Sequence, residues 1–246
     1  MKIVKYTKLK NGQYKLTFDN DTNALLHEDL ILKYALLINK ELNNKELERM
    51  LEENNLYVAY DLALKYLKTK MRSTKEIREY LIKKDFKTEY IDKAIELLEK
   101  QKYLNDDFYC EAYINDKINL SSDGPYKIME NLKKLGISNN IIQSHIIVFE
   151  KELEISRIEK IVTKQVKQNH NKSLYFLKKK LVEYLTNLGY TKELVIRCVN
   201  EIKMDDTDIL KKEYDKIYSK LSRKYSGKEL EYKVRQRMYQ KGFFQD

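Results

Sequence analysis

The residues best suited to chemistry in this chain are lysines and arginines that recur in short clusters. Such side chains bind anions, and a regular ladder of them can follow a phosphate backbone or an acidic strip on a protein. Two clusters, Lys83-Lys84 and Lys133-Lys134, fall at corresponding points of a repeated sequence pattern. The alternative is that these side chains belong to ordinary solvated helix faces, with a favourable dipole interaction near helix C-termini. The candidate binding residues are Lys70, Arg72, Lys75, Arg78, Lys83, Lys84, Lys127, Lys133, Lys134, Lys178, Lys179, Lys180, Arg223, Lys224, Arg235 and Arg237.

Other residue types give no support for catalysis. His27, His145 and His170 lie far apart, without cysteine or carboxylate partners at metal-ligand spacing. The chain also lacks a Gly-rich phosphate loop, a nucleophile elbow and a zinc signature. Asp106-Asp107 could ligate a metal, but at a predicted helix start they are better explained as cap and dipole partners. The sequence therefore predicts no enzyme, no cofactor and no metal site.

The tyrosines allow two interpretations. Aromatic residues interleaved with lysines can stack on the bases of single-stranded nucleic acid. Because the chain has twenty tyrosines, no tryptophan and only seven phenylalanines, we expect tyrosine to fill the contacts between helices, with its hydroxyl at the edge of the core. The tyrosines expected in this role are Tyr66, Tyr80, Tyr103, Tyr113 and Tyr184.

Composition indicates helices joined by short turns, since the 246 residues include only six glycines and one proline, and 35% are charged. The formal charge of +10 is uneven: residues 1–56 are balanced, 57–105 carry +4, 106–154 carry −4, 155–205 carry +6 and 206–246 carry +4. A uniformly basic chain would indicate nucleic acid alone, whereas this alternation could also match a protein surface that alternates beside its own nucleic acid. A general lysine bias of the source is the alternative explanation.

Location and redox state are also predicted. No stretch approaches the roughly 18 apolar residues of a membrane span, and the N-terminus lacks the apolar core of a secretory signal. We therefore expect a cytoplasmic monomer, in which Cys110 and Cys198 are reduced, buried thiols.

A phrase that occurs four times indicates how the basic residues are positioned. A large apolar residue is followed by three mostly polar residues, a Gly or Asp, and another large apolar residue. The copies at 81–86, 132–137, 185–190 and 238–243 end 51, 53 and 53 positions apart. The Gly or Asp predicts a left-handed residue that ends a helix, with the next apolar side chain folded back on its last turn. Such a period is typical of arrays of stacked supersecondary units.

The predicted fold class is mostly α: an elongated array of tandem three-helix repeats, with a small N-terminal β-meander plus two helices. We expect the meander over 1–26 with an Asn11-Gly12 hairpin, and helices at 28–38, 44–53 and 56–70. The predicted division is 1–55 for the meander and helical cap, 56–105, 106–154 and 155–205 for complete repeats, and 206–246 for an incomplete fourth repeat of two helices.

Several helix starts are predicted from capping residues. Asn43 with Glu46, Ser73 with Glu76, and Ser226 with Glu229 have the spacing of capping boxes. Thr88 is expected to cap the third helix of the first repeat. After the fourth phrase only Phe244-Gln-Asp246 remain, so we expect two helices in the last repeat, which either cap the array or leave an apolar groove, unless the sequence is a shortened one.

Three stretches carry a family resemblance. They are Ala63-Leu64-x-x-Leu67 with Arg72-Ser73 and Glu76-Ile-Arg78-x-x-Leu81, then Tyr103-Leu-Asn-Asp106-Asp107-Phe108-Tyr-Cys-Glu-Ala112, then Gly124-Pro125-x-x-Ile128-x-x-x-Leu132-x-x-x-Gly136-Ile137. Together they resemble the RecX family of bacterial recombination regulators over residues 57 to 140, and the repeat period extends the likeness to the C-terminus. Asp85 stands where that family more usually has glycine, and Asp tolerates left-handed geometry better than most residues.

The resemblance implies a non-catalytic protein that binds the RecA recombinase, chiefly as its nucleoprotein filament on single-stranded DNA. It implies inhibition of filament extension, ATPase and strand exchange, within the SOS response and DNA repair by homologous recombination. The main alternative is a sequence-independent DNA-binding protein that competes for single-stranded DNA. A third interpretation is a scaffold that dimerises through the unfinished fourth repeat.

Overall fold

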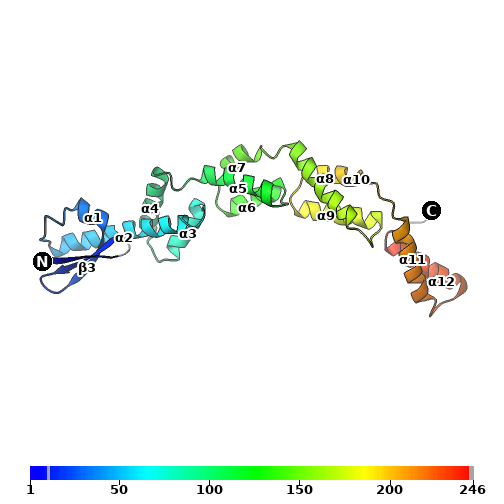
Figure 1. Ribbon diagram of the computed structural model, residues 1–246, viewed down its shortest axis with the longest axis horizontal. Helices are drawn as coiled ribbons and strands as arrows, with labels where there is room; N and C mark the ends of the chain where they lie inside the picture. Colours follow the sequence, from blue (N-terminus) through cyan, green and yellow to red (C-terminus); the bar gives the residue numbers. More distant parts are fainter. Residues whose placement is uncertain (10–11, 244–246) are drawn as a thin grey trace. The chain divides into compact units, whose positions relative to one another are not determined.

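The computed structural model describes residues 1–9 and 12–243, which form two compact units. Unit 1 comprises Met1–Cys110 together with Leu135–Ile137, and unit 2 comprises Glu111–Lys134 together with the chain from Ser138 onward. The predicted fold class, mostly α with an N-terminal meander, is confirmed (Figure 1). Within the described residues, no helix is both long enough and apolar enough to cross a membrane.

Unit 1 begins with a three-stranded antiparallel sheet. Alternation along the middle strand turns Leu16 and Phe18 into a core shared with the first two helices. Gly12, at the hairpin between the first two strands, has a left-handed φ of 68°, whereas Asn11 lies outside the described residues. The strands, in sheet order, are β1 (Ile3–Lys8), β2 (Gln13–Phe18) and β3 (Asn23–His27).

Helix α1 (Glu28–Lys33) is shorter than the predicted helix at 28–38. Ala35 adopts a left-handed φ of 48°, and the N–H of Leu36 donates to the carbonyl of Ile31 at 2.9 Å. This turn carries the Leu36 side chain into the core, where it is 1% exposed. The helix ends early because burial of the Leu36 side chain stabilises the fold more than another helical turn would.

Helix α2 (Asn44–Leu67) runs through positions 54 and 55 without interruption, so the predicted break between two helices is wrong. The buried side chain of Asn54 bonds to β3 and not to its own helix. It accepts a hydrogen bond from the N–H of His27 at 2.7 Å and donates to the carbonyl of Leu25 at 3.2 Å. The predicted boundary between residues 55 and 56 therefore falls inside α2.

The second half of α2 packs with α3 (Thr74–Ile82) and α4 (Thr88–Lys100) in a three-helix group. The predicted capping boxes at Asn43 and Ser73 are both confirmed. Thr88 does not cap α4: the N-cap residue is Lys87, whose side chain makes no cap hydrogen bond. The core residues of the group are Ala59, Ala63, Ile77, Leu81, Ile91, Ala94, Ile95, Leu98 and Leu104.

The remaining helices belong to unit 2, except that α5 begins in unit 1. The predicted boundary between residues 154 and 155 falls inside α8, because Glu154 in its first turn is buried and accepts a hydrogen bond from the Thr191 hydroxyl at 3.1 Å. The helices are α5 (Asp106–Leu120), α6 (Pro125–Lys134), α7 (Asn139–Ile146), α8 (Lys151–Lys167), α9 (Leu174–Asn187), α10 (Lys192–Asn200), α11 (Thr207–Leu221) and α12 (Gly227–Gln240).

Helices α11 and α12 pack on each other around a small core that includes Val234 and Met238. The predicted capping box at Ser226 is wrong, since its side chain makes no cap hydrogen bond. The next residue, Gly227, has a left-handed φ of 55°, so the chain enters α12 without the geometry of a side-chain cap. The residues predicted to follow the fourth phrase, 244–246, lie outside the described residues.

The four phrases end helices as predicted. Asp85, Gly136, Gly189 and Gly242 have φ values of 62°, 86°, 84° and 76°. At three copies the N–H of the following apolar residue donates to the carbonyl five positions earlier, as from Phe86 to Leu81. This is the hydrogen bond expected of a left-handed helix end with its hydrophobic contact.

The structure adds a feature that the sequence did not predict, because the glycines of the phrases are also points of close approach. In unit 1 the hydroxyl of Ser73, at the start of α3, donates to the carbonyl of Leu135 at 2.7 Å. A Cβ at Gly136 would lie 2.7 Å from the Cβ of Lys75. We call this contact, between the start of one helix and the glycine turn after a later one, a glycine joint.

Unit 2 contains the same joint at the start of α9. Ser173 donates to the carbonyl of Lys241 at 2.8 Å, and a Cβ at Gly242 would lie 2.7 Å from the Ser173 hydroxyl. In both units the N–H of the residue after the serine donates to a carboxylate. Thr74 donates to Asp106 at 2.8 Å, and Leu174 donates to Asp206 at 2.7 Å. The two joints therefore have the same pair of hydrogen bonds.

A third joint, also in unit 2, has a glycine at the position that a serine occupies in the other two. The N–H of Gly124, just before α6, donates to the carbonyl of Leu188 at 2.6 Å. A Cβ at Gly189 would lie 2.4 Å from the backbone nitrogen of Lys127. Two backbones meet here at a distance that no side chain at either glycine would allow.

Candidate partner-binding surface

Positive charge gathers on the second helix of each helical group, namely α3, α6, α9 and α12. Counted with the two residues after it, α3 carries four basic and two acidic side chains, α6 and α9 carry three and one each, and α12 carries five and two. The first helices of the groups differ among themselves: α2 and α5 are acidic, with three basic against five acidic side chains and one against four, whereas α8 and α11 are basic, with five against three and four against three. Twelve of the sixteen basic candidates lie on these second helices or in the two residues after them, and the other four, Lys70, Arg72, Arg223 and Lys224, lie in turns.

Four of the predicted candidates are held by contacts within the protein. Arg72 donates to the Glu76 carboxylate at 3.2 Å and stacks on the ring of Tyr66 at 4.0 Å. Arg78 donates to Asp92 at 2.5 Å, and Lys178 donates to the carbonyl of Asn200 at 2.9 Å. Arg78 and Lys178 thereby join α3 to α4 and α9 to the end of α10, and all three cations are less available to a partner.

Lys127, the fourth, pairs with Asp123 at 2.7 Å in the turn before α6. Burial of the Asp123 carboxyl would raise its pKa, but the hydrogen bond and charge of Lys127, with help from Lys117, outweigh burial and hold the pKa below its ordinary value. This pair supports the joint at Gly124.

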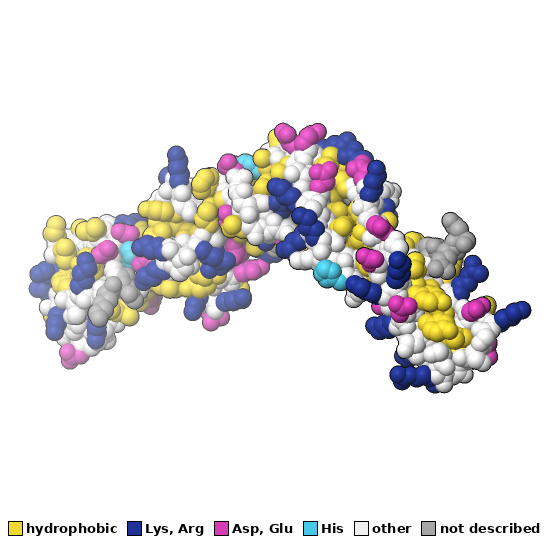
Figure 2. Space-filling view, turned by 45° about the vertical axis from the view of Figure 1, so that its right-hand side comes forward, with side chains coloured by type: hydrophobic (Ala, Val, Ile, Leu, Met, Phe, Trp, Pro, Cys, Tyr) yellow, Lys and Arg dark blue, Asp and Glu magenta, His cyan; other side chains and the backbone are white. Residues whose placement is uncertain are grey.

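The other predicted candidates are exposed at the surface. Lys70 and Lys75 lie 3.8 Å from glutamates, Lys84 lies over the ring of Tyr80, and Arg237 donates to Gln240. On the face that Figure 2 shows, basic side chains are interspersed with acidic and neutral ones. Seven candidates are exposed, and their side chains have no ion-pair or hydrogen-bond partner among the described residues: Lys83, Lys133, Lys179, Lys180, Arg223, Lys224 and Arg235.

The sequence analysis missed one basic stripe. Lys160, Lys164 and Lys167 are exposed on α8, with Thr163 beside them, and line one open pocket. Their spacing of four and three residues places them on one face of a helix. That spacing is the signal in the sequence, and it is less visible than a run of adjacent lysines because three or four residues separate each lysine from the next.

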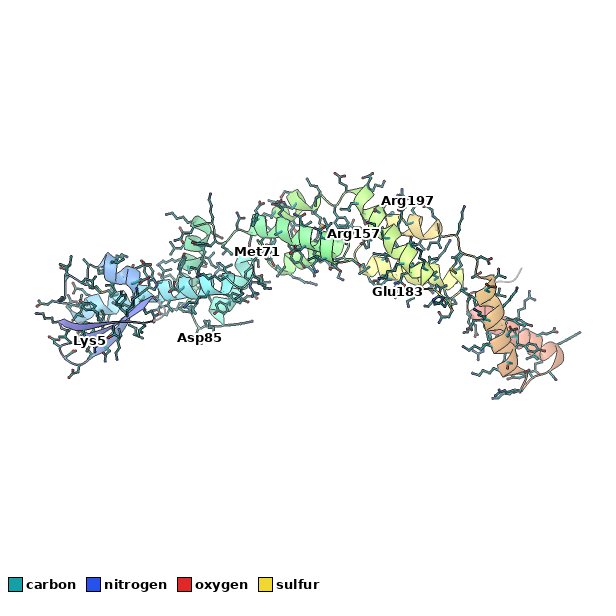
Figure 3. All side chains as sticks on the ribbon, viewed as in Figure 1. Lys5, Met71, Asp85, Arg157, Glu183 and Arg197 are labelled. Carbon is teal, nitrogen blue, oxygen red and sulfur yellow. The ribbon has the colours of Figure 1, made fainter. Side chains whose placement is uncertain are left out.

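It also missed Arg157, which holds the end of α5 in unit 2 and is labelled on α8 in Figure 3. Its guanidinium donates to the carbonyls of Ile118 and Ser121, the second at 2.7 Å, and to the hydroxyl of Tyr190 at 3.3 Å. Burial raises the pKa of Tyr190 above its ordinary value. Arg157 therefore satisfies helix-end carbonyls and serves structure.

The described residues contain no cluster of three or more His, Cys, Asp or Glu that could hold a metal ion. Asp106 accepts from Thr74, and Asn105 caps α5 in its place, by accepting from the N–H of Asp107 at 2.9 Å. Both cysteines are buried thiols outside any disulfide, as predicted. Burial raises the pKa of the Cys110 thiol to about 11, so this thiol is a poor nucleophile.

Comparison with known proteins adds the family. Residues 59–98, which span the three-helix group of unit 1, match the family model described as RecX, first three-helix domain. Regulatory protein RecX of Streptococcus agalactiae serotype III is 30% identical over 249 residues, which covers 99% of this chain and 95% of the relative. The chain belongs to the RecX family of regulatory proteins. Regulatory protein RecX of Lactococcus lactis subsp. cremoris strain MG1363 is 29% identical over 254 residues, covering 100% and 94%.

Solved RecX structures share the fold. A crystal structure of a regulatory protein RecX superposes with a TM-score of 0.70 at 24% identity, covering 81% of this chain and 99% of that chain. The crystal structure of RecX from Lactobacillus salivarius gives a TM-score of 0.57 at 26% identity, covering 61% and 97%. The RecX family predicted from the repeat motifs is confirmed.

Proposed function

We propose that this RecX-family protein binds the RecA recombinase and its nucleoprotein filament on single-stranded DNA, and thereby inhibits filament extension, ATPase and strand exchange. It acts in the cytoplasm as a monomer, by binding alone, without a cofactor. The observation that carries the proposal is the recurrence of exposed cations on the second helix of every helical group, in a chain whose relatives are named regulatory proteins. RecA itself enters through the family.

The mechanism is the addition of many weak contacts. A single exposed ion pair contributes about 0.2 to 1 kcal/mol, so no one lysine on this surface can supply useful affinity. Second helices that recur with period of about fifty residues can each contact successive positions on a partner that is itself repetitive. Binding distributed in this way weakens steeply with salt, because exposed charges are screened.

The test is ATP hydrolysis by RecA on single-stranded DNA with the protein added at a small fraction of the RecA concentration. We expect turnover to fall, and to fall less as salt rises. Unchanged turnover at low salt, where exposed charges act most strongly, would contradict the proposal.

The alternative function, sequence-independent DNA binding that competes for the strand, is favoured by the stripe of Lys160, Lys164 and Lys167 on α8. A row of lysines on one helix face suits a phosphate backbone, and each neutralised phosphate steepens the salt dependence. Under this alternative, Lys164→Glu weakens binding to oligothymidine and the protein shows no affinity for RecA without DNA. Direct RecA binding that survives Lys164→Glu would reject it.

A further inference from the structure

A pocket of about 340 Å³ opens on unit 1 between the end of α2 and the start of α5. Leu64 and Leu67 are half-buried in its lining, while Met71, Tyr103 and Phe108 are 46%, 57% and 60% exposed. Met71 is labelled in Figure 3, in the segment that joins α2 to α3. Three large apolar side chains that gather around one pocket and remain exposed indicate a binding surface. The prediction that Tyr103 fills the core is therefore wrong.

The rim of the pocket is held in place by local structure. Lys102 has a left-handed φ of 61°, at a position where glycine would be less strained, and the N–H of Tyr103 donates to the carbonyl of Leu98 at 2.9 Å. Asn105 accepts from the N–H of Phe108 at 3.1 Å, which fixes the first turn of α5. A left-handed residue other than glycine persists only where the surrounding structure holds it, so the positions of Lys102 and Tyr103 are fixed by their contacts.

The charges of the lining have one sign. Lys68, Arg72 and Lys102 line the pocket, and none of the lining residues is a carboxylate. Arg72 is already paired with Glu76, but Lys68 and Lys102 are exposed and have no ion-pair partner among the residues described. The pocket thus combines an apolar floor with two available cations.

We propose that this pocket binds an acidic peptide segment of a partner protein, with one large apolar side chain in the pocket and carboxylates beside Lys68 and Lys102. The floor decides between peptide and nucleic acid. Bases stack on flat aromatic faces, which Tyr103 and Phe108 offer only at the rim, whereas the floor of Leu64, Leu67 and Met71 is aliphatic and suits an apolar side chain. This site does not depend on the proposed RecA function.

The experiment uses the full chain and a short fluorescein-labelled peptide of Asp, Glu and Ser with one central Phe, followed by fluorescence anisotropy. The matched peptide carries Ala for Phe, and we expect it to bind about tenfold more weakly, since burial of the ring is lost. Lys68→Glu should weaken the Phe peptide about fivefold. Lys65→Glu, the same charge change on the same helix outside the pocket, should leave binding unchanged.

Met71→Glu places a carboxylate in the apolar floor and should abolish binding, with circular dichroism to verify folding. Lys68→Glu, a surface change, keeps the test decisive if Met71→Glu does not fold. Three results would overturn the proposal: equal binding of the Phe and Ala peptides, equal loss in Lys65→Glu and Lys68→Glu, or no anisotropy change up to about 1 mM protein. Loss of oligothymidine binding in Lys68→Glu, with no binding of the peptide, would assign the pocket to nucleic acid and also overturn it.

Discussion

The turn at Asp85 and the turns at Gly136, Gly189 and Gly242 have the same backbone but different neighbours. All four have a left-handed φ between 62° and 86°. Asp85 is exposed at the end of α3, whereas each glycine lies against the start of another helix. The difference teaches that left-handed geometry alone tolerates aspartate, and that close approach is what demands glycine.

Among substitutions at these turns, Gly189→Ala should lower the free energy of unfolding most. The new Cβ would meet the backbone nitrogen of Lys127 at 2.4 Å, and the left-handed φ of 84° adds strain. We expect a loss of about 3 kcal/mol or more in the free energy of unfolding, measured by urea denaturation. Asp85→Ala changes an exposed residue and should cost only about 1 kcal/mol. Similar losses for both variants would break the comparison.

Ser73→Ala should have an intermediate effect, because it removes the other half of a glycine joint. The variant loses the hydrogen bond to the carbonyl of Leu135 and the cap of the Glu76 N–H. We expect a cost of about 1 to 2 kcal/mol in urea unfolding. Ser226→Ala is the matched control, since Ser226 occupies an N-cap without a side-chain cap bond. A loss at Ser226 equal to that at Ser73 would count against the joint.

Asp85→Gly should have a smaller effect of opposite sign. Glycine relieves the left-handed strain at φ 62° but gains freedom in the unfolded chain, so we expect a net stabilisation of about 0.5 kcal/mol. Thermal and urea unfolding of the full chain measure it. A destabilised variant would mean that the Asp85 side chain itself contributes to the fold.

The ion pair between Asp123 and Lys127 allows a test of the joint at Gly124, which has no serine. Because Lys127 holds the pKa of Asp123 below its ordinary value, the stability from this pair is fully present above the ordinary carboxyl pKa of about 4. It is lost as pH falls through the lowered pKa of the folded state. Lys127→Met should flatten this part of the acid unfolding curve, and an identical curve would show that the pair is not coupled to folding.

Much of the fold could be predicted because its signals are local. The left-handed turns follow from the spacing of Gly or Asp within each phrase, and the capping boxes at Asn43 and Ser73 follow from residue type three positions apart. The misses come from tertiary contacts. Asn54 looks like a helix stop until its partners on β3 are known, and Glu154 belongs inside α8 because it reaches Thr191.

The candidate surface was predictable in part for the same reason. Runs such as Lys178–Lys180 are visible in sequence, but periodicity cannot tell that Lys178 bonds to a carbonyl while its two neighbours are exposed. Exposure of Tyr103 beside Met71 and Phe108 depends on how α2 meets α5, which no local pattern encodes.

The most direct test of the account is binding to RecA filaments on single-stranded DNA after charge reversal on a second helix. The double variant Lys179→Glu with Lys180→Glu changes two exposed residues of α9. The matched control, Lys192→Glu with Lys203→Glu, changes two exposed lysines outside any second helix. We expect about tenfold weaker filament binding by cosedimentation for the first pair and no change for the second. Equal affinity for both variants would contradict the claim that the second helices form the partner-binding surface.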